Sequence, residues 1–206
     1  MKKAIFALMA IAMLGAFTGC KCTNEKADEA TVEPAELVLE NLISADRQYM
    51  FLNYGSDYKF YESCVQFDNF LDADTTITIH GVSNIFQVIE KFDSTSFDTK
   101  VVSIAHVSDN HGIEVKEHAF WVGDEALNEE EIKVTLAQAI ERVYAANYPK
   151  PHSRYVVLRK EIGPADANAQ YIFGNSQAQL YVDAVTGEVT DENPAFKGFG
   201  LAAKKK

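Results

Sequence analysis

The sequence predicts an α+β protein in which helices pack on antiparallel β-sheet. Two segments carry apolar residues at three- and four-residue spacing, which is typical of amphipathic helices. Each is followed by several short runs of alternating apolar and polar residues, as in strands with one buried face. Turn-forming residues separate these runs, so neighbouring strands are expected to pair antiparallel.

The first twenty residues are organised as a secretory signal of the lipoprotein type. Two lysines precede a mostly apolar run, 4–17, which is too short for a membrane span of about 20 residues. The sequence Ala-Phe-Thr-Gly-Cys that ends at Cys20 resembles the bacterial lipobox, although Phe17 stands where leucine is usual. The resemblance implies that Cys20 is acylated and becomes the mature N-terminus. An ordinary signal peptide is the alternative.

Polar residues follow Cys20 and indicate a solvated tether over 20–33. Its acidic content resembles the tether of surface-exposed lipoproteins of Bacteroides-like bacteria. Stable anchoring needs more than one acyl chain, which the multiply acylated cysteine of bacterial lipoproteins provides. We therefore expect the protein in the cell envelope, held by lipid at the outer membrane.

The charge of the mature chain argues against nucleic acid as a partner. Cleavage before Cys20 removes two lysines and no acid, which leaves 17 basic and 30 acidic residues and a formal charge of −13. A field of this sign repels nucleic acid. The one basic cluster, 204–206, lies at the end of a predicted tail over 197–206.

Two thiols besides Cys20 remain, Cys22 in the tether and Cys64 in a predicted strand. The compartment permits a Cys22–Cys64 disulfide. A free Cys22 with a half-buried Cys64 is the simpler arrangement. No C-x-x-C sequence occurs, so nothing indicates a redox motif or a cysteine zinc site.

The first helix is predicted over 34–52. Pro34 suits a first helical turn, and Gly55 is a plausible stop. The apolar side chains that share one face of this helix are Leu39, Leu42, Ile43, Tyr49 and Met50.

Alternating sequence begins after this helix. A strand is expected over 58–70, with further strands at 76–80 and 85–90. In the first strand, the alternation places Tyr61, Val65 and Phe67 on one face, and Phe60 and Cys64 on the other.

Residues 100–108 and 113–122 form the clearest predicted hairpin. The sequence Asp-Asn-His-Gly between them suits a tight turn. A turn centred on residues 110 and 111 would put one set of apolar residues on the core face, namely Val102, Ile104, Ile113, Val115, Ala119 and Trp121. In this register His106 and His118 point to opposite faces.

A second helix is predicted to begin at Thr135, where Thr135 and Gln138 form a capping box. Pro149 must end it. Its buried stripe is expected to comprise Leu136, Ile140, Val143 and Tyr144. Three strands follow, at 154–162, 169–173 and 178–184.

The segment 132–190 resembles a PepSY domain. The resemblance rests on Thr-Leu-Ala-Gln-Ala-Ile at 135–140, Tyr-Ile-Phe at 171–173 and Tyr-Val-Asp-Ala-Val-Thr-Gly-Glu-Val at 181–189. A tight turn is the alternative explanation of the sequence at 181–189. In such a turn Asp183 caps backbone donors and Gly187 has a positive φ.

The PepSY resemblance implies a small non-catalytic module that restrains peptidases or binds at the cell envelope. It brings no catalytic residue to this chain. PepSY propeptides precede their protease, whereas seventeen residues follow Val189 here, so restraint would act in trans. The sequence at 70–75 echoes 181–186, so two α-β-β-β halves are an alternative organisation.

The expected organisation has five parts. They are a signal peptide (1–19), a tether (20–33), an α+β N-terminal subdomain (34–123), a PepSY-like domain (132–196) and a tail (197–206), with an acidic stretch before residue 132 as the boundary.

No arrangement of residues predicts a catalytic or metal site. The histidines at 80, 106, 111, 118 and 152 lack the ligand spacing of a zinc site. The acids at 72 and 74 lack the later ligands of a calcium loop, and no nucleophile or phosphate-binding motif occurs. We therefore predict no enzymatic activity, no metal and no cofactor. A hydrolase with an unrecognised site is an alternative.

Aromatic side chains are the one sequence feature that suits binding. Six rings crowd thirteen residues: Tyr49, Phe51, Tyr54, Tyr58, Phe60 and Tyr61. The sequence predicts a non-enzymatic lipoprotein that binds a protein or peptide partner, with restraint of a secreted peptidase as its most concrete form. The alternative is a glycan-binding envelope lipoprotein that uses these rings. Three exposed coplanar rings would favour glycan, and an open sheet face or edge would favour a peptide.

Overall fold

The computed structural model describes residues 37–73, 76–91, 97–108, 110–118 and 125–199. The chain divides into two compact units, 1–33 and 34–206, and every described residue belongs to the second. The predicted signal peptide, the tether with Cys22 and the lipid-attachment residue Cys20 lie outside the described residues.

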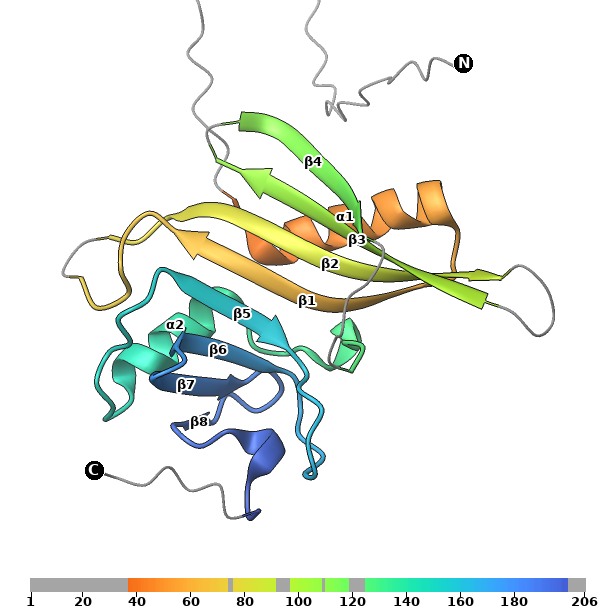
Figure 1. Ribbon diagram of the computed structural model, residues 1–206. Coiled ribbons are helices and arrows are strands. Elements are labelled where there is room, and N and C mark those ends of the chain that lie inside the picture. The colour runs from red at the N-terminus through yellow and green to blue at the C-terminus, as the bar shows by residue number, and fades with distance from the viewer. Residues whose placement is uncertain (1–36, 74–75, 92–96, 109, 119–124, 200–206) are drawn as a thin grey trace, which may run out of the picture. The chain divides into compact units, whose positions relative to one another are not determined.

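The described residues form helices and strands in a simple order (Figure 1). The elements are α1 (Leu39–Tyr54), β1 (Tyr58–Phe67), β2 (Ile79–Lys91), β3 (Phe97–Val107), β4 (Asn110–His118), the 3-10 turn η1 (Glu129–Glu131), α2 (Leu136–Ala145), β5 (Tyr155–Arg159), β6 (Gln170–Asn175), β7 (Ala178–Asp183), β8 (Val189–Thr190) and the 3-10 turn η2 (Pro194–Phe196).

The eight strands form a single antiparallel sheet in the order β4-β3-β2-β1-β5-β6-β7-β8. The two halves of the chain meet where β1 pairs with β5, with Glu62 opposite Arg159 and Gln66 opposite Tyr155. The predicted fold class, a helix packed on sheet in two α-β-β-β halves, is therefore wrong. In the described part of the chain, the β1–β5 pairing joins the eight strands into one sheet, which dominates the fold beside two α-helices.

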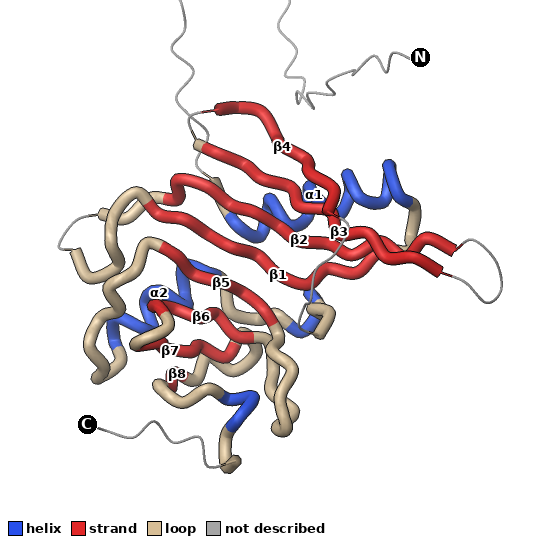
Figure 2. The backbone as a smooth tube through the Cα atoms, in the orientation of Figure 1, coloured by secondary structure: helices blue, strands red, loops and turns tan. Residues whose placement is uncertain are grey.

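Both helices lie on the same face of this sheet (Figures 1 and 2). α1 packs against β1 and β2, and α2 packs against β7. Both contribute to one hydrophobic core, with Leu39 and Met50 from α1 and Val143 from α2. A carboxylate oxygen of Glu40 in α1 accepts the N–H of Leu136, the first residue of α2, at 2.8 Å. This contact joins the helices and places a negative charge at the positive end of α2.

Helix boundaries follow the predicted caps. α1 ends at Gly55, which has φ 75° and donates its N–H to the Phe51 carbonyl. α2 begins with the predicted capping box: the Thr135 N–H donates to Gln138 Oε1 at 3.0 Å, and the Gln138 N–H donates to Thr135 Oγ1 at 3.2 Å. α1 starts at Leu39, while Pro34 lies outside the described residues.

The first half departs from the predicted strands in two places. The strands expected at 76–80 and 85–90 are one strand, β2, because the backbone at Gly81 continues in pairing opposite Val107. Phe60 shares the core face with Val65 and Phe67, contrary to the simple alternation. A β-bulge between Phe60 and Glu62 adds one residue and so moves Phe60 to the face of Val65 and Phe67.

The predicted hairpin forms with a register shifted by two residues. His106 lies opposite Ile113, and Ile104 lies opposite Val115. A shift of two residues keeps every side chain on its face, so Val102, Ile104 and Val115 lie on the core side as predicted, whereas Ile113 is 49% exposed. His106 and His118 point to opposite faces as predicted. The expected partners Ala119 and Trp121 lie outside the described residues.

The second half has the predicted order of a helix and antiparallel strands β5, β6 and β7. These strands are not a separate three-stranded sheet, because β1 and β8 flank them. Tyr144, predicted to be buried, is 38% exposed, and Ala139 occupies the buried stripe with Leu136 and Val143.

Candidate functional site

The face of the sheet opposite the helices carries no described helix along β4, β3, β2, β1 and β5. We call this surface the open face. Direct cross-strand partners lie on the same face of a sheet, so the strand register orders its side chains into two rows. The first row is Lys116, Ser103, Ile85, Glu62, Arg159, Gln170 and Asp183. The second row is Glu114, Ala105, Ser83, Cys64, Val157, Ile172, Tyr181 and Thr190.

Small and apolar side chains occupy the middle of the second row. Ala105, Ser83, Cys64 and Val157 stand side by side on four adjacent strands, and each is half-buried. Short side chains let another molecule approach the sheet closely. Burial, and then the charge of Glu62, raises the pKa of the Cys64 thiol. Cys64 is a free cysteine, and its thiol therefore stays protonated and unreactive near neutral pH.

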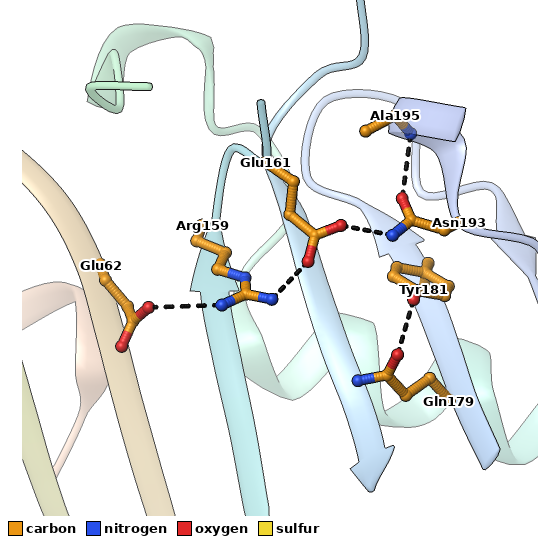
Figure 3. A network of polar contacts seen from close by, with 7 residues as sticks. All are labelled: Glu62, Arg159, Glu161, Gln179, Tyr181, Asn193 and Ala195. Carbon is orange, nitrogen blue, oxygen red and sulfur yellow. Dashed lines mark hydrogen bonds and ion pairs between the residues drawn. The ribbon is translucent and has the colours of Figure 1, made fainter. Parts of the chain in front are cut away.

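A charged network stands in the first row, at the junction of the two halves of the chain (Figure 3). The Arg159 guanidinium donates to Glu161 and lies 3.8 Å from the Glu62 carboxylate. Glu161 also accepts the amide of Asn193 at 2.5 Å. Two carboxylates thus face one guanidinium, and the network is net negative.

The far end of the rows, on β6 and β7, is covered by two chain segments. Asn193 accepts the N–H of Ala195 at 3.0 Å, and the Ala165 N–H donates to the Ala195 carbonyl at 3.0 Å. Tyr181, beside Asn193 in Figure 3, is consequently 4% exposed. Burial, followed by the charge of Glu161, raises the pKa of the Tyr181 phenol. Among the described residues, the side chains of the two rows that are half-buried or exposed therefore lie mainly on β4 to β5.

An acidic hollow of about 330 Å³ lies at the β6–β8 end of the first row. Its lining includes Asn168, Gln170, Asp183, Glu188, Glu192 and Lys197. Gln170 is 3% exposed; its amide N–H donates to the Asn168 carbonyl at 3.0 Å, whereas its Oε1 accepts no hydrogen bond from the described residues. A buried amide oxygen without a donor costs about 1–3 kcal/mol.

The turn that carries the PepSY-like motif lies beside this hollow. Asp183 Oδ1 accepts the N–H groups of Val185 and Thr186, both at 2.8 Å, and Oδ2 accepts the Asn168 amide at 2.9 Å. Although burial alone would raise it, these hydrogen bonds lower the pKa of Asp183 below its usual value. Gly187 has φ 76°, so the motif residues have the roles that a tight turn requires.

A buried polar network lies on the other face, beneath α1. Asp46, 2% exposed, accepts the Asn84 amide at 2.7 Å, and its two oxygens lie 2.8 and 3.0 Å from His106 Nε2. Ser63 donates its hydroxyl to Asn84 Oδ1, and both residues are fully buried. The Ser63 hydroxyl is thus buried and hydrogen-bonded to an amide, so it is not placed to attack a substrate. The network instead connects α1 to β1, β2 and β3.

Sequence reasoning missed this network, although a signal for it exists. Each member is a single polar residue at a core-facing position: Asp46 within the apolar stripe of α1, and Asn84 between Val82 and Phe86. Four lone polar residues on the core faces of neighbouring elements indicate a shared hydrogen-bond network, because buried polar groups need partners.

The crowded aromatic segment supplies core rather than a platform of rings. Phe60 is buried, and Tyr49, Tyr54 and Tyr58 pack partly buried against the core. The Tyr58 and Phe60 rings contact Phe86 at interplanar angles of 78° and 36°. Of the six, Phe51 alone is largely exposed, at 59%. The condition set for a glycan site, three exposed coplanar rings, is not met by this segment.

The histidines considered as metal ligands lie apart from one another in the described residues. His106 belongs to the Asp46 network, His118 lies 3.0 Å from the Ser103 hydroxyl, and His152 lies 2.9 Å from Asp72 while its ring stacks on Phe70 at 4.1 Å. Within the part of the chain that the structure describes, no group of three histidine, cysteine or acidic side chains is placed to hold a metal ion. Neither described helix has both the length and the hydrophobicity of a membrane span.

Comparison with known proteins gives no relative for this chain. No family model, no curated protein and no solved structure matches it.

Proposed function

We propose that this protein is an exported, lipid-anchored, non-enzymatic lipoprotein that binds a protein or peptide partner through its open face. The observation that carries the proposal is the sheet itself: its helices cover one face, and the opposite face presents small, half-buried side chains across β3, β2, β1 and β5. Apolar surface that a chain leaves in contact with water is typical of an interaction site.

The sheet face is a better binding surface than the sheet edge. The edge strand β4 carries three charged residues, Glu114, Lys116 and Glu117, and charges on an edge strand oppose the addition of another strand. In the second row, the central strands instead place the uncharged Ser83 and Cys64 between Ala105 and Val157. A surface of small side chains that extends over several strands fits a folded partner better than a single sugar ring.

Restraint of a secreted peptidase is the specific form of this function that we propose. It is supported by the PepSY-like sequence at 132–190 and by the placement of its motif in a well-formed turn beside the sheet. Acylation at Cys20 would hold the protein where secreted peptidases pass. A restraining protein acts by occupying its partner, so the effect is stoichiometric.

The test is a titration of the purified protein against peptidases secreted by the same cell. We expect saturable inhibition of at least one of them, complete near one equivalent, with no cleavage of substrate by the protein alone. Retention on a glycan column, together with no binding to any peptidase in the panel, would overturn the proposal in favour of the glycan-binding alternative.

A further inference from the structure

The segment that links β5 to β6, residues 160–169, extends past the ends of both strands (Figures 1 and 2). It carries one large hydrophobic side chain that is exposed, Ile162, which is 61% exposed. Exposure alternates from residue 161 to residue 168: the even-numbered residues are exposed, whereas the odd-numbered residues between them are half-buried. Such alternation is typical of an extended backbone, in which successive side chains point to opposite sides. Ile162 therefore points outward from an extended segment.

The two residues before Ile162 are held to other parts of the fold. The Glu125 N–H donates to the Lys160 carbonyl at 2.9 Å, and the Lys160 ammonium pairs with the Glu125 carboxylate, also at 2.9 Å. Glu161 is bound on both carboxylate oxygens by the charged network of Figure 3. The backbone that enters Ile162 is therefore fixed.

The residues after Ile162 are fixed as well. A Cβ at Gly163 would overlap the Ala195 carbonyl, so the backbone of Gly163 packs directly against that turn. Pro164 has a restricted φ, and the Ala165 N–H donates to the Ala195 carbonyl at 3.0 Å. A single exposed isoleucine is ordinary on a protein surface. On a backbone that is held on both sides, however, it is pre-organised to enter a pocket, because binding has little conformational entropy left to remove.

The position of Ile162 relates it to the open face. Its neighbour Glu161 belongs to the charged network in the first row, so Ile162 lies one residue beyond the surface that the partner covers. Complexes of peptidases with their protein inhibitors form with little movement of the backbone at the interface. A fixed, extended segment with one outward side chain suits such a contact.

We propose that Ile162 enters the specificity pocket of the restrained peptidase, and that this pocket is apolar and receives aliphatic side chains. The inference rests on the proposed function, because it identifies a feature of the same partner. Specificity pockets of peptidases differ in charge and size: some contain a carboxylate, and others are hydrophobic. An isoleucine fills a hydrophobic pocket, whereas in a charged pocket it would leave the buried charge without a partner.

The test uses the peptidase that the unchanged protein inhibits in the titration above. Ile162→Lys should raise the inhibition constant at least about 100-fold, because an ammonium group would be buried in an apolar pocket. Ile162→Val removes one methylene and should raise it less than about fivefold. The control Leu52→Lys replaces a 73% exposed aliphatic side chain of α1 and should change it less than about twofold. Circular dichroism verifies that each variant is folded.

The specificity of the same peptidase is measured with tetrapeptide nitroanilides that end in valine, lysine or glutamate. We expect the valine substrate to have the highest kcat/KM, by at least about tenfold. The full-length protein should raise the KM for this substrate and leave kcat unchanged, since Ile162 and the substrate side chain compete for one pocket.

Two results would overturn the inference and leave the proposed function standing. Unchanged inhibition by Ile162→Lys, together with lost inhibition by Ser83→Arg, would show that the peptidase binds the open face without this side chain. A preference of the peptidase for the lysine or glutamate substrate would show that its pocket does not receive an aliphatic side chain. Inhibition of no secreted peptidase by the unchanged protein would instead refute the proposed function, and the inference with it, before any variant is made.

Discussion

Removal of the Asp46 carboxylate is the most informative perturbation of the fold. Asp46 lies in α1 and is 2% exposed. Its carboxylate accepts hydrogen bonds from Asn84 on β2 at 2.7 Å and from His106 on β3 at 2.8 Å. The substitution Asp46→Ala leaves both donors without this acceptor, one in the fully buried Asn84 and one in the partly buried His106.

The magnitude follows from those two donors. Each donor that is left unsatisfied in a buried site costs about 1–3 kcal/mol, and two donors lose their acceptor here. We therefore expect Asp46→Ala to lower the free energy of unfolding by about 3–5 kcal/mol, a large part of the about 5–15 kcal/mol that holds an ordinary domain together. Asp46→Asn keeps an oxygen for Asn84 and should lose about 1–2 kcal/mol.

Urea unfolding followed by far-ultraviolet circular dichroism measures the difference. Gln48→Ala, at an exposed position of the same helix, is the matched control and should change stability by less than about 0.5 kcal/mol. If Asp46→Ala loses less than about 1 kcal/mol, the network does not fasten α1 to the sheet and the reasoning is refuted.

Three further predictions concern the turn and the anchor. Gly187→Ala should lower stability by about 1–2 kcal/mol in thermal unfolding, because φ is 76° there and the new Cβ would lie 2.4 Å from Arg142 Cζ; Gly187→Asn should lose less. The lowered pKa of Asp183 contributes stability above the pKa of the unfolded carboxyl, about 3.9, that is lost as pH falls through the folded value; Asp183→Asn should flatten the acid limb of a pH–stability curve, and an unchanged limb would count against this. Cys20→Ser should release the protein from the membrane fraction and abolish incorporation of labelled fatty acid, whereas a membrane-bound variant would reveal another anchor.

Local structure followed from the sequence where one short segment contains its own determinants. Gly55 ends α1, Thr135 and Gln138 cap α2, and Asp183 organises the turn after β7, as their types and spacing predict. In each case the hydrogen bonds that decide the conformation join residues no more than four apart.

Features that depend on contacts between distant residues could not be predicted from the sequence. The pairing of β1 with β5 joins Glu62 to Arg159, and no local pattern reports such a contact. The bulge at Tyr61 moved Phe60 to the core face, because a period of two in the sequence does not reveal one added residue. The rows of the open face became apparent only when register placed Ser83 between Cys64 and Ala105.

The central claim is that a protein partner binds on the open face, and one comparison tests it most directly. Ser83→Arg introduces a long charged side chain among the small residues of the second row, and Gln48→Arg introduces the same group on the exposed side of α1. The dissociation constant of each variant with the inhibited peptidase is measured by surface plasmon resonance, with circular dichroism to verify folding. We predict that Ser83→Arg weakens binding about 100-fold or more while Gln48→Arg leaves it within about twofold. Equal affinities for the two folded variants would contradict the claim.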